Sequence, residues 1–234
     1  MSEKLALLYA NRFDSNARSW KNEVWGILWK RVFARWVRPE DTLLDLGAGY
    51  CEFINHAVAK RRYAVDLNPE TAALAAAGVE VKAASADSLG FLQNGEVDVV
   101  FTSNFLEHLP SKDSVSRVLD EAHRVLKPGG HLMLMGPNIR YLADQYWDYF
   151  DHHVPLSHAS VCEALELHGF TLDHVEPRFL PYTVKGTRLH AAFLVEAYLA
   201  LRPFSSALLG KQFFVVASKP PERNAPPSPR RSPP

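Results

Sequence analysis

The pattern of apolar and polar positions changes at about residue 41. Before it, apolar side chains recur at helical spacing over residues 20–36, and Pro39 ends this helical stretch. After it, short apolar runs alternate with stretches of helical character, which predicts an α/β domain with a mostly parallel sheet. The runs that predict strands are residues 42–46, 63–66, 79–83, 97–101, 131–135, 170–177 and 212–218.

The stretches between these runs predict helices. They cover residues 52–60, 69–77, 111–126, about 158–168 and about 187–201. Ser111 is expected to cap its helix, and Asn68 is expected to cap the helix that starts at Pro69. The sequence Lys-Pro-Gly-Gly that follows the third of these helices is expected to stop it and to turn the chain.

This pattern divides the chain into three regions. Residues 1–40 form an N-terminal helical lid segment, whose tryptophans indicate either core packing or a lid over a ligand. Residues 41–218 form the α/β domain, with a helical insertion at residues 178–211. Residues 219–234 are rich in proline and poor in apolar side chains, which predicts a disordered tail.

Composition and charge narrow the function classes. The 234 residues are 47% hydrophobic and 22% charged, as in ordinary globular proteins. Lys+Arg and Asp+Glu number 26 each, which argues against a dedicated nucleic-acid-binding protein. This balance is an average, because residues 1–40 carry +4, the proline-rich tail +3 and the remainder −7. With two cysteines and no apolar secretory signal in the first residues, a cytoplasmic protein is expected.

A glycine turn follows the first predicted strand, in LLDLGAGYCEF at residues 43–53. Gly47 and Gly49 let the backbone turn sharply and approach a ligand closely. Glu52 stands where a dinucleotide fingerprint would have its last glycine, so this class of fold is disfavoured. Asp45 lies at the carboxyl end of the strand, just before the turn.

Two more acids follow strands of their own. Asp66 ends the second predicted strand, 21 positions after Asp45, where a carboxylate can accept hydrogen bonds from both hydroxyls of a ribose. Asp87 follows the third strand and could reach an adenine amino group. A glycine turn with two acids, each after its own strand, indicates a nucleoside-binding edge.

These segments, together with SADSL, VDVVFTSNFLEHLP and EAHRVLKPGGHLMLMGPN, resemble a class I S-adenosylmethionine-dependent methyltransferase of the broad small-molecule type. The resemblance covers about residues 41–137. It implies a doubly wound, Rossmann-like sheet of seven strands, six parallel and one antiparallel, with the last two predicted strands as a hairpin-like pair. It also implies S-adenosyl-L-methionine as the cofactor.

The same resemblance assigns cofactor contacts to residues of this chain. The methionine end would be lined by Asp45, Gly47, Ala48, Gly49, Ser103 and Asn104. Asp66, with Leu67 beside it, would hold the ribose, and the adenine would be met by Ala86, Asp87 and Ser88. Arg12 would pair with the methionine carboxylate from the N-terminal lid. Cys51 replaces the third glycine that is usual in the family.

Candidate catalytic residues lie after the fourth and fifth strands, where open α/β sheets bind ligands. His108 follows the fourth strand, and Asp151 and His152 lie in the sequence DHH at residues 151–153. One of these side chains could take the proton of an acceptor hydroxyl, or the histidines could be structural or solvated. The spacing D-H-H-x4-H matches no closed zinc pattern, so no metal site is predicted.

The sequence therefore predicts methyl transfer to a small-molecule acceptor, at a hydroxyl, with a sugar or glycan precursor as the expected class. The rivals are a protein or RNA methyltransferase and a non-catalytic cofactor-binding module. The apolar helix within residues 178–211 could lie on a membrane as a peripheral contact, or pack against the sheet or a second subunit. No nucleic-acid partner is expected, and the oligomeric state is open.

Overall fold

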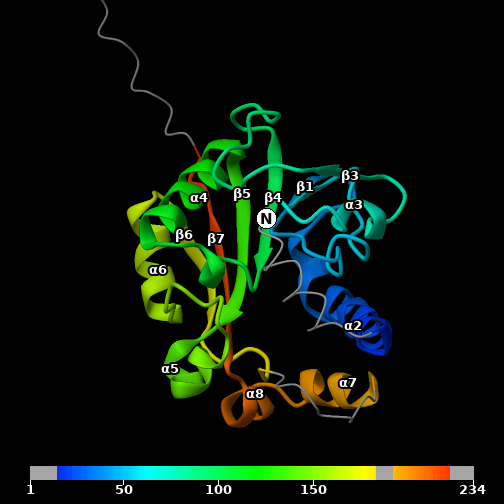
Figure 1. The fold of residues 1–234 in the computed structure, drawn as a ribbon, viewed down its shortest axis with the longest axis vertical. Coiled ribbons are helices and arrows are strands. Elements are labelled where there is room, and N and C mark those ends of the chain that lie inside the picture. Colours follow the sequence, from blue (N-terminus) through cyan, green and yellow to red (C-terminus); the bar gives the residue numbers. More distant parts are fainter. Residues whose placement is uncertain (1–14, 183–191, 222–234) are drawn as a thin grey trace, which may run out of the picture.

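The computed structural model describes residues 15–182 and 192–221 (Figure 1). Within them, a seven-stranded sheet has the order β3-β2-β1-β4-β5-β7-β6. Strand β7 is antiparallel to β5 and β6, and all other neighbours are parallel, which confirms the expected architecture. The strands are β1 (Thr42–Leu46), β2 (Arg61–Val65), β3 (Val79–Lys82), β4 (Val97–Ser103), β5 (Leu126–Pro137), β6 (Thr171–Glu176) and β7 (Gln212–Ser218).

The burial of each strand follows its place in the sheet. All five residues of β1 and six of the seven in β7 are buried, because helices cover both faces of the central strands. The edge strand β6 alternates exposed and half-buried residues instead. The near-continuous apolar runs in the sequence thus mark the middle of the sheet, and the alternating run marks its edge.

Helices cover the two faces of this sheet (Figure 1). One face packs against α4 and α6, and the other against α2 and η1. The helical elements are α2 (Ser15–Leu28), η1 (Trp29–Phe33), η2 (Ala34–Trp36), α3 (Thr71–Leu74), η3 (Leu106–His108), α4 (Lys112–Val125), α5 (Ile139–Leu142), η4 (Ala143–Asp148), α6 (His158–Leu167), α7 (Ala192–Ala200) and α8 (Phe204–Leu209).

The N-terminal segment joins the core through an aromatic cluster. Phe33 is fully buried and packs its ring against those of Phe53, Phe101 and Phe214. Trp25 stacks on Phe33 with ring centroids 6.1 Å apart. The tryptophan stripe from residue 25 onward therefore packs as core. The lid role expected for residues 1–40 stays a prediction, and residues 1–14 lie outside the described part of the chain.

The helix expected at residues 52–60 is wrong, because this stretch folds as successive turns. The guanidinium of Arg62 donates to the backbone carbonyls of Ile54 and Ala57. These carbonyls are thus bonded from outside the segment. The next predicted helix is also shorter and starts later than expected, because α3 spans only Thr71–Leu74. The expected Asn68 cap is wrong: Asn68 Oδ1 accepts from the Glu70 N–H before the helix begins, and α3 has no side-chain cap.

The expected cap of α4 and its end before Lys-Pro-Gly-Gly are confirmed, whereas that sequence lies within a strand and not in a separate turn. Ser111 Oγ accepts from the Ser114 N–H at 3.2 Å, so the helix begins where the sequence indicated. The Lys-Pro-Gly-Gly sequence belongs to β5, because Gly129 N–H donates to the Lys219 carbonyl and Lys219 N–H donates to Gly130. A pairing with a residue 90 positions away thus extends the strand through the predicted turn.

In the described part of the insertion before β7, helices α7 and α8 lie below the sheet in Figure 1, and residues 183–191 are outside the described chain. Helix α7 lies beside α2, and its Glu196 pairs with Arg31 of η1 at 2.8 Å. The outer side of the insertion exposes large apolar side chains, with Phe193 at 68%, Phe204 at 81% and Leu208 at 76%. Across the described residues, the helices are too short or too polar to span a lipid bilayer.

Candidate active site

The glycine turn after β1 is fastened to the end of β2. The N–H groups of Gly47 and Ala48 both donate to the Val65 carbonyl, at 2.9 and 3.1 Å. Gly47 and Gly49 have φ of 69° and 51°, in the left-handed region that favours glycine. Among residues 15–182 and 192–221, a Cβ on Gly49 would meet nothing within 4 Å, so this part of the chain leaves room for a ligand at the backbone there.

Asp66 joins this turn to the loop after β2. Its Oδ2 accepts from the Gly49 N–H and its Oδ1 from the Asn68 N–H, each at 2.7 Å. The side chain is half-buried, and Leu67 beside it is 57% exposed. We call Gly47, Ala48, Gly49 and Asp66 together the glycine edge.

Asp45 and Cys51 support the glycine edge from inside the protein. Asp45 is only 3% exposed, and burial, together with the nearby carboxylates of Asp66 and Glu52, raises its pKa well above the ordinary value. Cys51 is fully buried with a φ of 62°, and burial raises the pKa of its thiol to about 12. The residue that replaces the third glycine therefore keeps a glycine-like backbone while it fills the core.

The predicted adenine-side residues lie after β3. Asp87 accepts hydrogen bonds from the Ser85 hydroxyl and from Arg117 Nε, and these two partners lower the pKa of its carboxyl. Ala86 is buried and Ser88 is exposed. The contact of these three residues with adenine stays a prediction.

Two further predicted cofactor residues end β4, and one lies outside the described chain. Asn104 has a left-handed φ of 49°, and its side-chain amide donates to Ser103 Oγ at 3.0 Å. Both are at the carboxyl edge of the sheet, beside the glycine edge. Arg12 is outside the described residues, so its pairing with the methionine carboxylate stays a prediction.

A buried cluster lies immediately beyond, where η3 follows β4. Glu107 is 2% exposed, and its backbone carbonyl accepts from the N–H groups of His153 and Val154 at 2.8 and 3.1 Å. These bonds fix the segment around Asp151 against η3. Burial raises the pKa of the Glu107 carboxyl, and His108 beside it acts in the opposite sense.

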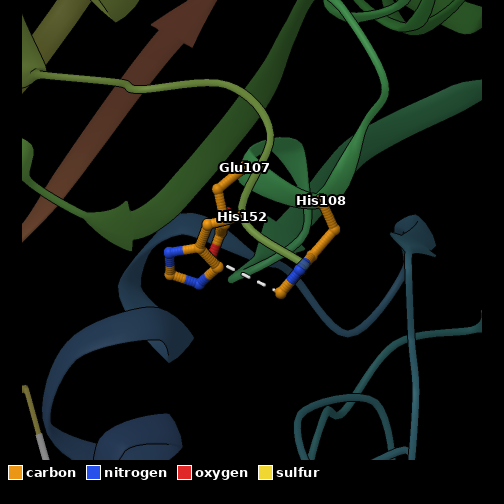
Figure 2. A group of neighbouring side chains, drawn as sticks. All are labelled: Glu107, His108 and His152. Carbon is orange, nitrogen blue, oxygen red and sulfur yellow. Dashed lines mark ion pairs between the residues drawn. The ribbon is translucent and has the colours of Figure 1, made fainter. Parts of the chain in front are cut away.

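Two histidines from different segments face Glu107 (Figure 2). His108 Nδ1 donates to the Asp151 carbonyl at 2.9 Å and lies 3.3 Å from Asp151 Oδ2. His152 is 5% exposed, and its Nδ1 donates to the Tyr146 carbonyl at 2.8 Å. One potential ligand atom from each of Glu107, His108 and His152 lies within 4.8 Å of the others. We call these three residues the His–Glu cluster.

The structure brings together the three predicted catalytic residues and adds a fourth. Asp151, His108 and His152 are neighbours, whereas His153 is exposed, so one of the two adjacent histidines points inward. Sequence reasoning missed Glu107 as a member of the site. Its signal was an acid within the apolar sequence FLEHL, where a charged side chain next to buried leucines needs a reason.

Phe105 connects the cluster with the glycine edge. A Cβ on Gly47 would overlap the ring of Phe105, two residues before Glu107. The turn that leads into η3 therefore packs directly on the glycine of the first turn. The two groups of predicted residues, cofactor-binding and catalytic, lie on adjoining parts of one edge.

Comparison with known proteins shows the class of this domain. Residues 44–134 match the family model of the methyltransferase domain. The chain carries a class I S-adenosylmethionine-dependent methyltransferase domain. It is therefore an enzyme of this class, and S-adenosylmethionine is its cofactor. No curated relative matches the sequence.

Solved structures share the fold of this methyltransferase at low sequence identity. A methyltransferase from Archaeoglobus fulgidus is 18% identical with a TM-score of 0.63, over 85% of this chain and 94% of that one. One from Mesorhizobium loti is 20% identical with a TM-score of 0.59, over 82% and 97%. A chain from the complex between the Trm112 methyltransferase activator of Haloferax volcanii and a methyltransferase is 18% identical with a TM-score of 0.63. The match covers 88% of this chain and 95% of that one.

The residues of the glycine edge fit this cofactor. The open space over Gly49 admits a ligand, and the half-buried Asp66 carboxylate stands beside it with both oxygens already oriented by backbone amides. An oriented carboxylate can accept further hydrogen bonds from ribose hydroxyls, since each oxygen has two lone pairs. The structural observations on this chain thus agree with the family match.

Proposed function

We propose that this methyltransferase transfers the methyl group to a hydroxyl of a small molecule, of the sugar or glycan-precursor class. The observation that carries the proposal is the His–Glu cluster, which lies next to the glycine edge and is largely closed to solvent. Glu107 and His152 are buried, and His108 keeps 21% of its side chain exposed. Access past one half-buried side chain favours a small acceptor over the surface of a macromolecule.

The protein's task in methyl transfer is alignment, because the displacement is in line. S-adenosylmethionine supplies the methyl group on a sulfonium when it is bound. The acceptor oxygen forms the new bond to the methyl carbon, the electron pair of the broken carbon–sulfur bond stays on sulfur, and the hydroxyl proton leaves at the cluster. The general-base role expected for His108, His152 or Asp151 stays a prediction.

The experiment follows labelled methyl groups into cell extract. Purified protein is incubated with extract and methyl-labelled S-adenosylmethionine, and small molecules are separated from protein and RNA. We expect label in the small-molecule fraction, lost in His108→Ala and His152→Ala and retained in His153→Ala, whose side chain is exposed. Label that enters protein or RNA and depends on these histidines would favour the macromolecule alternative and refute the proposal.

The peripheral membrane contact stays a separate prediction. It is supported by the exposed side chains of Phe193, Phe204 and Leu208 on the insertion. Sedimentation with phosphatidylglycerol vesicles tests it, with the double variant Phe204→Ser, Leu208→Ser as control. If the unaltered protein stays in the supernatant at low salt, the membrane contact is wrong, and a protein partner becomes the explanation of this face.

A further inference from the structure

The His–Glu cluster has the composition of a metal site that keeps a position open for substrate. Two imidazoles and one carboxylate are the protein ligands of one class of catalytic zinc centre, in which water or substrate is the fourth ligand. The three potential ligand atoms already lie within 4.8 Å of one another (Figure 2). Metal–ligand bonds of about 2.0–2.2 Å would require these atoms to move closer by small side-chain rotations.

Both histidines are held in the orientation that a metal ligand needs. Metal-binding histidines almost always donate their other ring N–H to a carbonyl or carboxylate, which fixes the tautomer. His108 Nδ1 and His152 Nδ1 each donate to a backbone carbonyl, of Asp151 at 2.9 Å and of Tyr146 at 2.8 Å. A carbonyl can only accept, so both neutral rings carry the proton on Nδ1 and the lone pair on Nε2. This pairing is found twice, on segments 44 positions apart.

The charges around the cluster also favour a cation. The carboxylates of Glu107 and Asp151 are 2% and 4% exposed, and both lie against His108. Buried charges are stable when they are paired or bind a metal.

We propose that Glu107, His108 and His152 bind one divalent cation of the zinc type. Imidazole ligands favour zinc, iron or nickel over magnesium or calcium, which prefer all-oxygen sites. The open coordination position would face the half-exposed side of His108, through which the acceptor enters. This part of the inference rests on the proposed function: the cation would take the acceptor oxygen as a ligand, lower the pKa of that hydroxyl and release its proton to water.

The test measures metal binding without methyl transfer. Tag-free protein is dialysed against Zn²⁺ for elemental analysis and titrated with Co²⁺, whose visible absorption reports four- or five-fold coordination. We expect one equivalent of metal and a Co²⁺ spectrum with nitrogen and oxygen ligands. Because changes at residues behind metal ligands already weaken binding about 10- to 100-fold, loss of a ligand itself should weaken it by at least that factor.

Two matched variants make the result specific. Glu107→Gln keeps the shape of the buried side chain and removes its charge, and His153→Ala removes the adjacent exposed histidine. We expect weak binding in the first and unchanged binding in the second, with circular dichroism showing that both are folded. The proposal is overturned if the unaltered protein binds no stoichiometric metal, or if folded Glu107→Gln binds it with equal affinity.

The labelling experiment under the proposed function separates the two conclusions. Transfer to small molecules by protein that holds no metal would support the proposed function and refute the cation site. A stoichiometric cation with label only in macromolecules would support the cation site and refute the proposed function.

Discussion

The glycine edge and the His–Glu cluster adjoin each other, yet they are built in different ways. The glycine edge is made mainly of backbone: two left-handed glycines, and amide groups that orient the Asp66 carboxylate. The cluster is made of side chains from two segments, and it is far more buried. A site made of backbone tolerates a partly exposed position, whereas a buried group of charged side chains persists only if each member is satisfied.

The two regions touch at Gly47 and Phe105, and the largest expected effect comes from changing that contact. In Gly47→Ala, the left-handed backbone costs about 1–2 kcal/mol, and moving the Phe105 ring costs about 1–3 kcal/mol more. Because Phe105 leads into Glu107, we expect both cofactor binding and the cluster to be impaired. Thermal unfolding and calorimetry with S-adenosylhomocysteine measure the two effects.

A double variant separates the steric part of this effect from the backbone part. In the Phe105→Ala background, the ring atoms that a Cβ on Gly47 would overlap are gone and only the Cβ of residue 105, at 2.9 Å, remains in its way. Gly47→Ala should therefore cost clearly less there, close to the backbone term of about 1–2 kcal/mol. If Gly47→Ala lowers the free energy of unfolding equally in both backgrounds, the Phe105 ring does not couple the two regions. The glycine edge and the His–Glu cluster would then be independent sites.

Asp66→Ala should come next, with an effect confined to the glycine edge. Removing a carboxylate that accepts from two backbone amides, and that is predicted to hold the ribose, should weaken cofactor binding about 10- to 100-fold. Asp66→Asn keeps one acceptor oxygen, so its affinity for the cofactor should lie between those of Asp66→Ala and the unaltered protein. Calorimetry with S-adenosylhomocysteine tests this, with the exposed Glu70→Ala as control. Equal affinity in Asp66→Ala and the unaltered protein would show that the ribose binds elsewhere.

The smallest expected effect concerns the backbone at Cys51. Cys51→Ala and Cys51→Gly both remove the buried thiol, but only alanine keeps a Cβ at a φ of 62°. The glycine variant should therefore be the more stable of the two by about 1 kcal/mol. Urea unfolding monitored by tryptophan fluorescence measures the difference. A more stable alanine variant would mean that the loop adopts another conformation once the thiol is gone.

The difference between the two regions also explains what the sequence could predict. Asp45 lies near the end of β1, and Asp66 and Asp87 follow β2 and β3, so the order of strands along the chain was enough to predict them at one edge. The strands themselves were predicted from short, mainly apolar runs such as residues 43–46, which lie in the buried strand β1. The sequence did not predict segments whose structure depends on partners far along the chain.

The cluster is the clearest case of such dependence. His108 and His152 come together because the Glu107 carbonyl binds two amides of the distant segment, and no local pattern encodes that pairing. A search for regular ligand spacing could not find Glu107, because the three residues have no regular spacing. The extended start of β5 depends in the same way on the distant Lys219, whereas the turns at residues 52–60 are bonded by the nearby Arg62.

The position of β7 has a consequence for synthesis of the protein. Within the described chain, β7 is the last strand to be made, and it lies between β5 and β6. A nascent chain can assemble β1–β5 while translation continues, but β6 has no strand to pair with until residues 212–218 emerge. During that interval the edge of β5 is open to strands of other chains, which makes it the expected starting point of aggregation when translation is slow.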